Sequence, residues 1–209
     1  ARVTINDELA IATSRVMIGD VVAIDGEKIK SKQRPIYIAL NKPVGITSTT
    51  DMSDKSNIIL FMNHAKRIFP VGRLDKDSEG LILLTNDGDI VNKILRSSNN
   101  NEKEYIVTVD KELTPQMIRQ MGTGVRILGE VTKPCFIRME GQRRFRIILK
   151  QGLNRQIRRM CETFGYKVKT LKRIRIMHIQ LGNLAVGKWR YLTPAEMLQL
   201  EKALENANG

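Results

Sequence analysis

The segment VGRLDKDSEGLILLTNDG, residues 71–88, places an uninterrupted apolar run among carboxylates. The run is short and is bounded by polar residues, so it predicts a strand that belongs to the core. Asp75 then lies where a loop enters that core. A carboxylate at such a boundary is desolvated on one side and gains from a nearby guanidinium. The acids around the run are Asp75, Asp77, Glu79 and Asp87.

Asp75 has two interpretations that its own neighbourhood leaves open. Asp favours turns, so a loop or capping role is the ordinary one. A functional role is favoured by Arg73, two residues earlier, and by a strongly basic segment further along the chain, residues 143–175. Such a segment supplies cations that hold an anion in its ionised form.

The chain as a whole is basic. Its 35 Lys and Arg residues exceed its 22 Asp and Glu residues, which gives a formal charge of +13. This balance indicates a polyanionic partner, with nucleic acid favoured over an anionic membrane. No apolar run approaches the roughly 18 residues of a membrane helix, so we expect no membrane association.

The only two cysteines are Cys135 and Cys161. No secretory segment is visible, so two free thiols in a reducing cytoplasm are favoured over a disulfide. With His64 and His178, these cysteines are too few and too far apart for a structural zinc site. The glycine patterns that bind phosphates or dinucleotides are also missing. We therefore expect no metal and no cofactor, which leaves carboxylate chemistry with Asp75 as the candidate.

The positive charge is concentrated between Arg143 and Arg175, where twelve Lys or Arg residues accompany one acid. Within this stretch, residues 154–165 have the apolar spacing of a helix, with Asn154 suited to cap its start and Gly165 to end it. The segment is the predicted footprint for phosphates, against the alternative of an ordinary amphipathic helix with a solvated basic face. The basic residues expected away from the apolar face are Arg155, Arg158 and Arg159.

Short strands and helices alternate unevenly along the chain, and no repeat is evident. This pattern favours an α+β fold around a mixed, mostly antiparallel sheet. Residues 1–33 hold only short strand-like pieces with a turn signal at Asp25-Gly26, and residues 26–35 are polar and basic like a linker. We therefore divide the chain into residues 1–33 and 34–209.

Two helix starts are marked in the sequence. Thr114 followed by Pro115 combines an N-cap residue with a proline at the first turn. Thr193 and Glu196 have the spacing of a capping box before an apolar stripe. We expect a helix to begin at each place.

The segment GRLDKDSEGLILLTND resembles the catalytic signature of the RNA pseudouridine synthases, in the branch named for the small-subunit rRNA enzyme RsuA. Four further segments resemble the other motifs of this family, in the same order, across residues 36–180. Residues 153–177 look closest to a member of the branch that acts on large-subunit rRNA. Residues 1–28 are similar to the C-terminal part of an S4 RNA-binding domain. The four segments are Asn41-Lys42-Pro43-Val44-Gly45, Lys103-Glu104-Tyr105, GLNRQIRRM and LKRIRI.

The resemblance implies the pseudouridine synthase fold and a reaction in which a uridine of RNA becomes pseudouridine without a cofactor. The base leaves its sugar, turns and rejoins through carbon, after the nucleotide has flipped out of its helix or loop. Asp75 would be the essential carboxylate, and it would either add to the sugar or remove a proton from it. Arg158 would pair with Asp75 and keep it ionised. Tyr105 would lie against the face of the uracil.

Further residues would bind the substrate. Arg73 would fill the space left by the flipped base, and Leu171 and Arg173 would complete the wall of the pocket. Asp77 and Glu79 are expected to be local loop structure, because short acidic side chains favour turns. The remaining expected RNA contacts are Lys42, Arg155 and Arg159.

The expected partner is ribosomal RNA of the large subunit, with tRNA as a second candidate. The protein is expected to be cytoplasmic and monomeric, since no heptad or exposed apolar stripe demands a dimer. One alternative is a non-catalytic RNA-binding or ribosome-assembly module. Another is a glycoside or nucleoside hydrolase that uses a carboxylate pair, Asp75 and Glu79. The concentrated basic charge suits a polymer and argues against a small nucleoside substrate.

Overall fold

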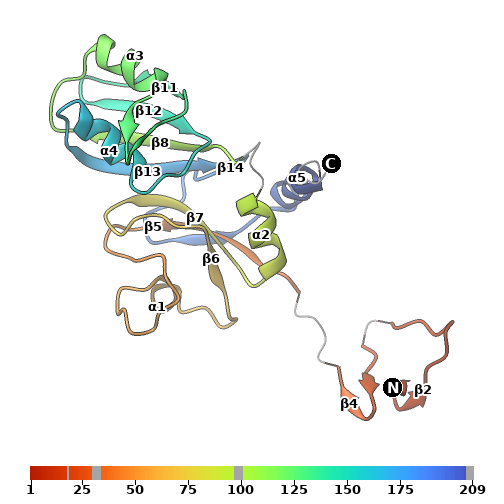
Figure 1. Cartoon of the computed structure of the whole chain (residues 1–209). Helices are drawn as coiled ribbons and strands as arrows, with labels where there is room; N and C mark the ends of the chain where they lie inside the picture. The colour runs from red at the N-terminus through yellow and green to blue at the C-terminus, as the bar shows by residue number, and fades with distance from the viewer. Residues whose placement is uncertain (18, 30–33, 97–100, 206–209) are drawn as a thin grey trace. The chain divides into compact units, whose positions relative to one another are not determined.

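The chain forms two compact units, residues 1–34 and 35–209 (Figure 1). The computed structural model describes all residues except 18, 30–33, 97–100 and 206–209. The predicted linker began too early, because a short strand occupies Glu27–Lys28. Its residues 30–33 lie outside the described part of the chain.

The first unit is a small antiparallel sheet with the strand order β2-β1-β3-β4. At Asp25-Gly26 both residues have positive φ, 49° and 85°, which is the geometry of a tight hairpin turn. The predicted turn is therefore confirmed. Among its described residues only Ala23 is buried, so this unit has a very small core. The strands are β1 (Val3–Ile5), β2 (Glu8–Leu9), β3 (Val22–Ile24) and β4 (Glu27–Lys28).

The second unit is built on a nine-stranded sheet whose main path runs β11-β12-β8-β13-β7-β5-β15, with β14 paired to β13 and β6 paired to β7. All of these pairs are antiparallel except β13 with β7, which is parallel. The predicted α+β fold with a mixed, mostly antiparallel sheet is confirmed. The strands are β5 (Tyr37–Lys42), β6 (Phe69–Val71), β7 (Glu79–Thr85), β8 (Lys103–Val109), β11 (Phe136–Met139), β12 (Arg144–Leu149), β13 (Val168–Ile176), β14 (Ile179–Gln180) and β15 (Trp189–Tyr191).

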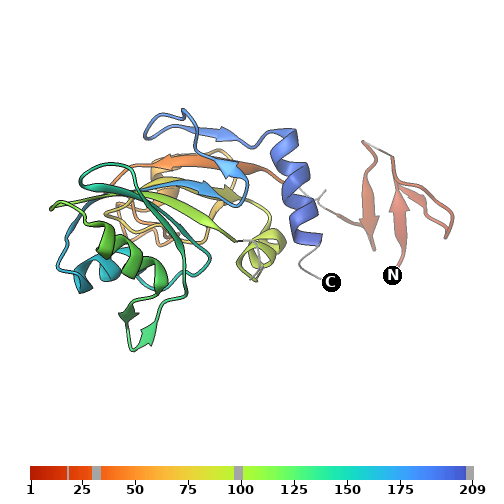
Figure 2. The same cartoon turned by 90° about the horizontal axis from the view of Figure 1, so that it is seen from above.

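The apolar run that follows Asp75 lies in strand β7, which is covered on both faces. Leu81 and Leu83 belong to a cluster that includes residues of α2 and α5, two helices that lie close together in both views (Figures 1 and 2). Ile82 and Leu84 belong to a second cluster, with Ile58 of α1. Alternate side chains of a strand point to opposite faces, so these two clusters lie on opposite sides of the sheet. The helices are α1 (Ile58–Met62), α2 (Gly88–Arg96) and α5 (Pro194–Glu205).

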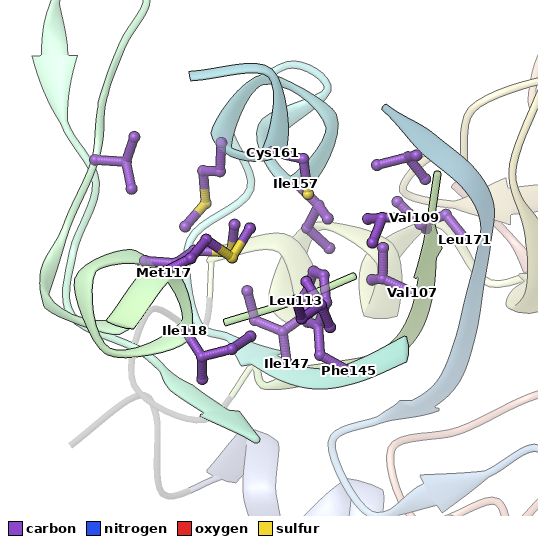
Figure 3. Packing of buried hydrophobic residues seen from close by; sticks show 14 of the residues in the cluster. Val107, Val109, Leu113, Met117, Ile118, Phe145, Ile147, Ile157, Cys161 and Leu171 are labelled. Carbon is purple, nitrogen blue, oxygen red and sulfur yellow. The ribbon is translucent and has the colours of Figure 1, made fainter. Parts of the chain in front are cut away.

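A third cluster lies between strands β8, β12 and β13 and two further helices (Figure 3). Helix α3 (Pro115–Thr123) contributes Met117 and Ile118, and helix α4 (Gln156–Thr163) contributes Ile157 and Cys161. Both helices therefore cover the same part of the sheet. A short hairpin of β9 (Arg126–Ile127) and β10 (Glu130–Val131) completes this half.

The predicted helix starts are both present. The Thr114 hydroxyl accepts a hydrogen bond from the backbone N–H of Met117, at the start of α3. At the start of α5, the N–H of Glu196 donates to the Thr193 hydroxyl and the N–H of Thr193 donates to the Glu196 carboxylate. These reciprocal bonds are those of a capping box, and they satisfy N–H groups that a helix end leaves free.

Candidate active site

The loop between β6 and β7 carries Asp75 and is fixed from several directions. Leu74 is buried in the cluster under α1, and both its backbone groups bind the hydroxyl of Ser48. The N–H of Gly45 donates to the carbonyl of residue 76 at 2.7 Å, and the N–H of Ser78 donates to the carbonyl of Asp75 at 3.0 Å. The backbone of Asp75 is thus held while 38% of its side chain stays exposed.

Arg155 is the cation closest to Asp75. One of its guanidinium nitrogens lies 3.5 Å from the Asp75 carboxylate. The same guanidinium donates two hydrogen bonds to Asp77, at 2.9 and 2.7 Å, in a fork geometry. These bonds to Arg155 lower the pKa of Asp77, although its partial burial acts in the opposite direction. Arg155 therefore links the two carboxylates.

Arg158 holds the same loop from helix α4 but at a different point. Its Nη2 donates to the carbonyl of Asp77 at 3.0 Å and to the hydroxyl of Ser78 at 3.2 Å, and its Nε lies 3.5 Å from the Asp77 carboxylate. Its side chain is only 11% exposed. The structure corrects two predictions here: Asp75 pairs with Arg155 instead of Arg158, and Asp77 is a partner of both arginines as well as a loop residue.

The start of α4 has an unusual backbone geometry. Arg155 is the N-cap residue and has φ 51° and ψ 37°, the left-handed region that non-glycine residues seldom adopt. The predicted cap, Asn154, is wrong: its side chain accepts a bond from Arg159 instead. Gly165, with φ 77°, follows the last turn, as predicted. Strained backbone of this kind is often found where function requires a particular side-chain position.

Four paired residues form a row across the middle of the sheet. Lys42 on β5 is opposite Gly80 on β7, Gly80 is opposite Arg173 on β13, and Arg173 is opposite Tyr105 on β8. Residues in register point to the same face, so Lys42, Arg173 and Tyr105 share one face. A Cβ atom at Gly80 would collide with the backbone of Arg173, so only glycine fits between the two cations.

The two cations of this row are buried. Lys42 is 0% exposed, and its ammonium donates to the carbonyls of Pro43 and Ile46 at 2.9 and 2.8 Å. Burial and the charge of Arg173 lower the pKa of Lys42 to about 8, although Asp75 and two neighbouring acids act in the opposite direction. Arg173 donates to the carbonyl of Leu81 at 2.7 Å. The predicted direct RNA contact of Lys42 is therefore wrong, because its side chain has no surface, and Arg173 is almost as deeply buried.

The other predicted site residues surround the row. Tyr105 is half-buried and packs against both the cluster under α1 and the cluster of α3 and α4, so it lies where the two meet. Leu171 is buried in the latter cluster. Arg73 is exposed and Arg159 is partly exposed, which leaves both accessible to a ligand. The site thus combines a held carboxylate, an aromatic ring and cations at two depths.

Comparison with known proteins now decides the family. Residues 36–163 match the RNA pseudouridylate synthase family. The chain is also 55% identical over 208 residues to the dual-specificity RNA pseudouridine synthase RluF of Escherichia coli O6:H1, an alignment that covers 99% of this chain and 72% of that protein. The chain belongs to the RNA pseudouridine synthase family.

More distant relatives of this synthase support the same family assignment. The ribosomal small subunit pseudouridine synthase A of Salmonella typhimurium is 33% identical and aligns over 94% of this chain and 87% of its own length. A crystal structure of a pseudouridylate synthase superposes with a TM-score of 0.75 at 28% identity, covering 95% of this chain and 88% of that one. The predicted family, its RsuA branch and the predicted enzyme class, an isomerase, are confirmed.

The described part of the synthase has neither a cluster of metal ligands nor a membrane-spanning helix. Within the described residues, no group of three or more His, Cys, Asp and Glu side chains is placed to hold a metal ion. In the same part of the chain, no helix is long and apolar enough to cross a bilayer. Cys135 and Cys161 are both free thiols, and burial raises the pKa of each.

Sequence reasoning missed three residues of the synthase site. Asp77 follows Asp75 by two positions, and its pattern is that of a turn residue, so its two arginine partners left no local signal. Ser78 is buried beneath Arg158, and Ser48 fixes the loop from a distant part of the sequence. A Ser in a loop has many local uses, so only the fold reveals these roles.

Proposed function

We propose that the synthase converts a specific uridine of large-subunit ribosomal RNA to pseudouridine, with Asp75 as the carboxylate that acts on the nucleotide. The observation that carries this assignment is the position of Asp75: its backbone is fixed by three neighbours while its carboxylate stays accessible beside Arg155. A cation at this distance favours the ionised carboxylate, which is the form that either adds to the sugar or accepts a proton.

The reaction needs no co-reactant. The bond between N1 of the uracil and the sugar breaks, a new bond forms between C5 and the same sugar carbon, and the C5 proton is released as N1 gains one. We assign Tyr105 to the face of the flipped uracil, because its ring lies on the same face as the Lys42–Arg173 row. We assign Arg158 to the positioning of the Asp75 loop, because it binds the loop backbone and not Asp75 itself.

The substrate should be held mainly through its phosphates. Arg73, Arg155 and Arg159 are the accessible arginines of the site, and each suits a phosphate oxygen. Large-subunit rRNA is the first substrate of this proposal. A second RNA, with tRNA as the candidate, is supported by the RluF relatives, which are described as dual-specificity enzymes. We place the reaction in the cytoplasm, with a monomeric enzyme.

The test compares the wild type with Asp75→Asn on transcripts of large-subunit rRNA, small-subunit rRNA and tRNA. Pseudouridine is mapped with a chemical adduct that stops reverse transcription. We expect a single strong stop in the large-subunit transcript with the wild type, at least 1,000-fold less product with Asp75→Asn, and unchanged RNA binding. This loss is the order of magnitude expected for removal of an essential catalytic group.

The control is Asp89→Asn, which removes an exposed carboxylate at the start of α2 and should leave activity unchanged. Equal product from wild type and Asp75→Asn would remove Asp75 from the mechanism. Modification confined to small-subunit rRNA or to tRNA would refute the proposed substrate and leave the assignment of Asp75 intact.

A further inference from the structure

A second aromatic site lies on the edge of the sheet, away from Tyr105. It is made by His64, Trp189 and Tyr191, which we call the ring cluster. The Trp189 and Tyr191 rings are 5.2 Å apart at 83°, and the His64 ring is 5.5 Å from Trp189 at 63°. Trp189 is 37% exposed and Tyr191 is 53% exposed. Trp189 is the chain's only tryptophan, and the site described above makes no use of it.

The ring cluster faces the same side of the sheet as the active site. Trp189 is opposite Leu40 and Tyr191 is opposite Ile38, and both partners belong to the cluster under α1. Leu74, the neighbour of Asp75, packs in that cluster, and Tyr105 packs against it. From β15 to β8 there are four strand spacings, roughly 19 Å at about 4.8 Å each. This distance is short enough for one RNA to contact both the active site and the rings.

The surroundings of the ring cluster suit a polyanion. The two segments that build it, residues 58–70 and 181–192, contain no Asp or Glu. They carry the exposed cations Lys66, Arg67 and Lys188. Arg190 lies between the two rings in sequence, but it is paired with Glu196 of α5, so its charge is already used. Exposed rings beside unpaired positive charge match the chemistry of RNA, in which bases stack and phosphates bind cations.

We propose that the ring cluster is a stacking platform for an unpaired base of the RNA substrate, outside the nucleotide that is modified. This proposal rests on the proposed function for the presence of an RNA on this face. It extends that function by assigning a second contact, through which the enzyme selects substrates with an unpaired base at a fixed distance from the target uridine. The rings supply the stacking surface, and the exposed Lys66, whose backbone N–H donates to the His64 ring, binds an adjoining phosphate.

Trp189 makes the test direct, because all tryptophan fluorescence of the chain comes from this residue. The fluorescence of Asp75→Asn is titrated with a large-subunit rRNA stem-loop that contains unpaired bases, and with a fully paired duplex of equal length. We expect saturable quenching with the stem-loop, and at least threefold less quenching with the duplex. The absence of quenching by saturating stem-loop would overturn the platform.

A second measurement uses substitutions. Trp189→Ala should weaken stem-loop binding about 5- to 100-fold, the range for loss of one base-aromatic stack, while Trp189→Phe should retain most of it. Thermal unfolding of both variants shows whether β15 stays folded. Equal binding by a folded Trp189→Ala would overturn the proposal. So would sedimentation showing that the substitution converts a dimer to a monomer, because the rings would then face a second copy of the chain.

The proposed reaction and the stacking platform can fail independently in these experiments. Quenching is read in Asp75→Asn, which needs no catalysis. If the wild type made no pseudouridine and quenching persisted, the proposed reaction would fail and the stacking platform would stand. Alternatively, the wild type could form product normally while Trp189→Ala changed neither the affinity for the stem-loop, measured without tryptophan fluorescence, nor the choice of substrate. In that case only the platform would fail.

Discussion

The cations of the site fall into two regions that the sequence motifs do not distinguish. Lys42 and Arg173 are buried in the row across the sheet, where backbone carbonyls accept their hydrogen bonds. Arg155 and Arg73, in contrast, are exposed. The difference shows that basic residues of the motifs have different functions. The buried cations bind backbone carbonyls, Arg155 binds the carboxylate of Asp77, and Arg73 is exposed and available for phosphate.

Gly80→Ala should cause the largest loss of stability in the buried region. Gly80 has φ 111°, and an added Cβ would collide with the backbone of Arg173. We expect a loss of about 3 kcal/mol or more in the free energy of unfolding, from the combined backbone strain and overpacking. Urea unfolding measures it. The control, Gly182→Ala, also has positive φ but meets no atom, so it should cost only the strain, about 1 kcal/mol. Equal losses of unfolding free energy in the two variants would show that β7 and β13 can move apart to accommodate a Cβ at residue 80.

A pH series on Lys42→Met should separate the charge of Lys42 from its packing. Burial lowers the pKa of Lys42 to about 8, so the unfolded chain binds more protons than the folded one between about pH 8 and 10.5. The wild type should therefore gain stability relative to Lys42→Met as pH rises through this window, by up to about 3 kcal/mol. Unfolding by urea at pH 7.5 and 10 measures the difference. A constant difference would mean that Lys42 has an ordinary pKa.

The salt dependence of RNA binding should distinguish the two regions most directly. Replacing a phosphate-binding cation lowers the slope of log affinity against log salt concentration by about 1. We expect this loss with Arg73→Ala, which removes an exposed arginine, and no change with Lys42→Met, when the same stem-loop is titrated between 50 and 200 mM salt. Equal slopes for both variants would contradict the division into buried and exposed cations.

The smallest effect is expected from Asp77→Asn. The pKa of Asp77 is lowered mainly by its bonds to Arg155, so the pair stabilises the fold above the ordinary pKa and the contribution is lost as pH falls through the lowered value. The carboxylate is nearly half exposed, so we expect at most about 1 kcal/mol at pH 7. Chemical unfolding at pH 7 and pH 3 should show the difference shrinking at the lower pH. A difference that persists at pH 3 would have another cause.

Features set by neighbouring residues were predictable from the sequence. The Thr114 and Thr193 helix starts, the Gly165 helix end and the Asp25-Gly26 turn depend on residues only a few positions apart. The family was also predictable, because its motifs occur in order. Its fold class followed from the uneven alternation of strands and helices.

Features set by the packing of distant segments were not predictable. The motif order predicted Arg158 as the partner of Asp75, but which arginine meets which aspartate depends on how α4 and the loop before β7 pack together, and Arg155 lies closer to Asp75. The burial of Lys42 depends on the strands on either side of β5. The ring cluster joins His64 to residues of the last strand, and nothing in either segment alone indicates that they meet.

The single parallel pair of the large sheet is a weak connection between the two halves of the active site. Strands β13 and β7 are joined through two residue pairs, Lys172 with Glu79 and Arg173 with Gly80, whereas β5 and β7 share six. Tyr105 lies on β8, on the β13 side of this pair, and Asp75 lies in the loop that leads from β6 into β7. A nucleotide that contacts both Asp75 and Tyr105 therefore spans a join of only two residue pairs, and we expect low concentrations of denaturant to abolish turnover before the sheet unfolds.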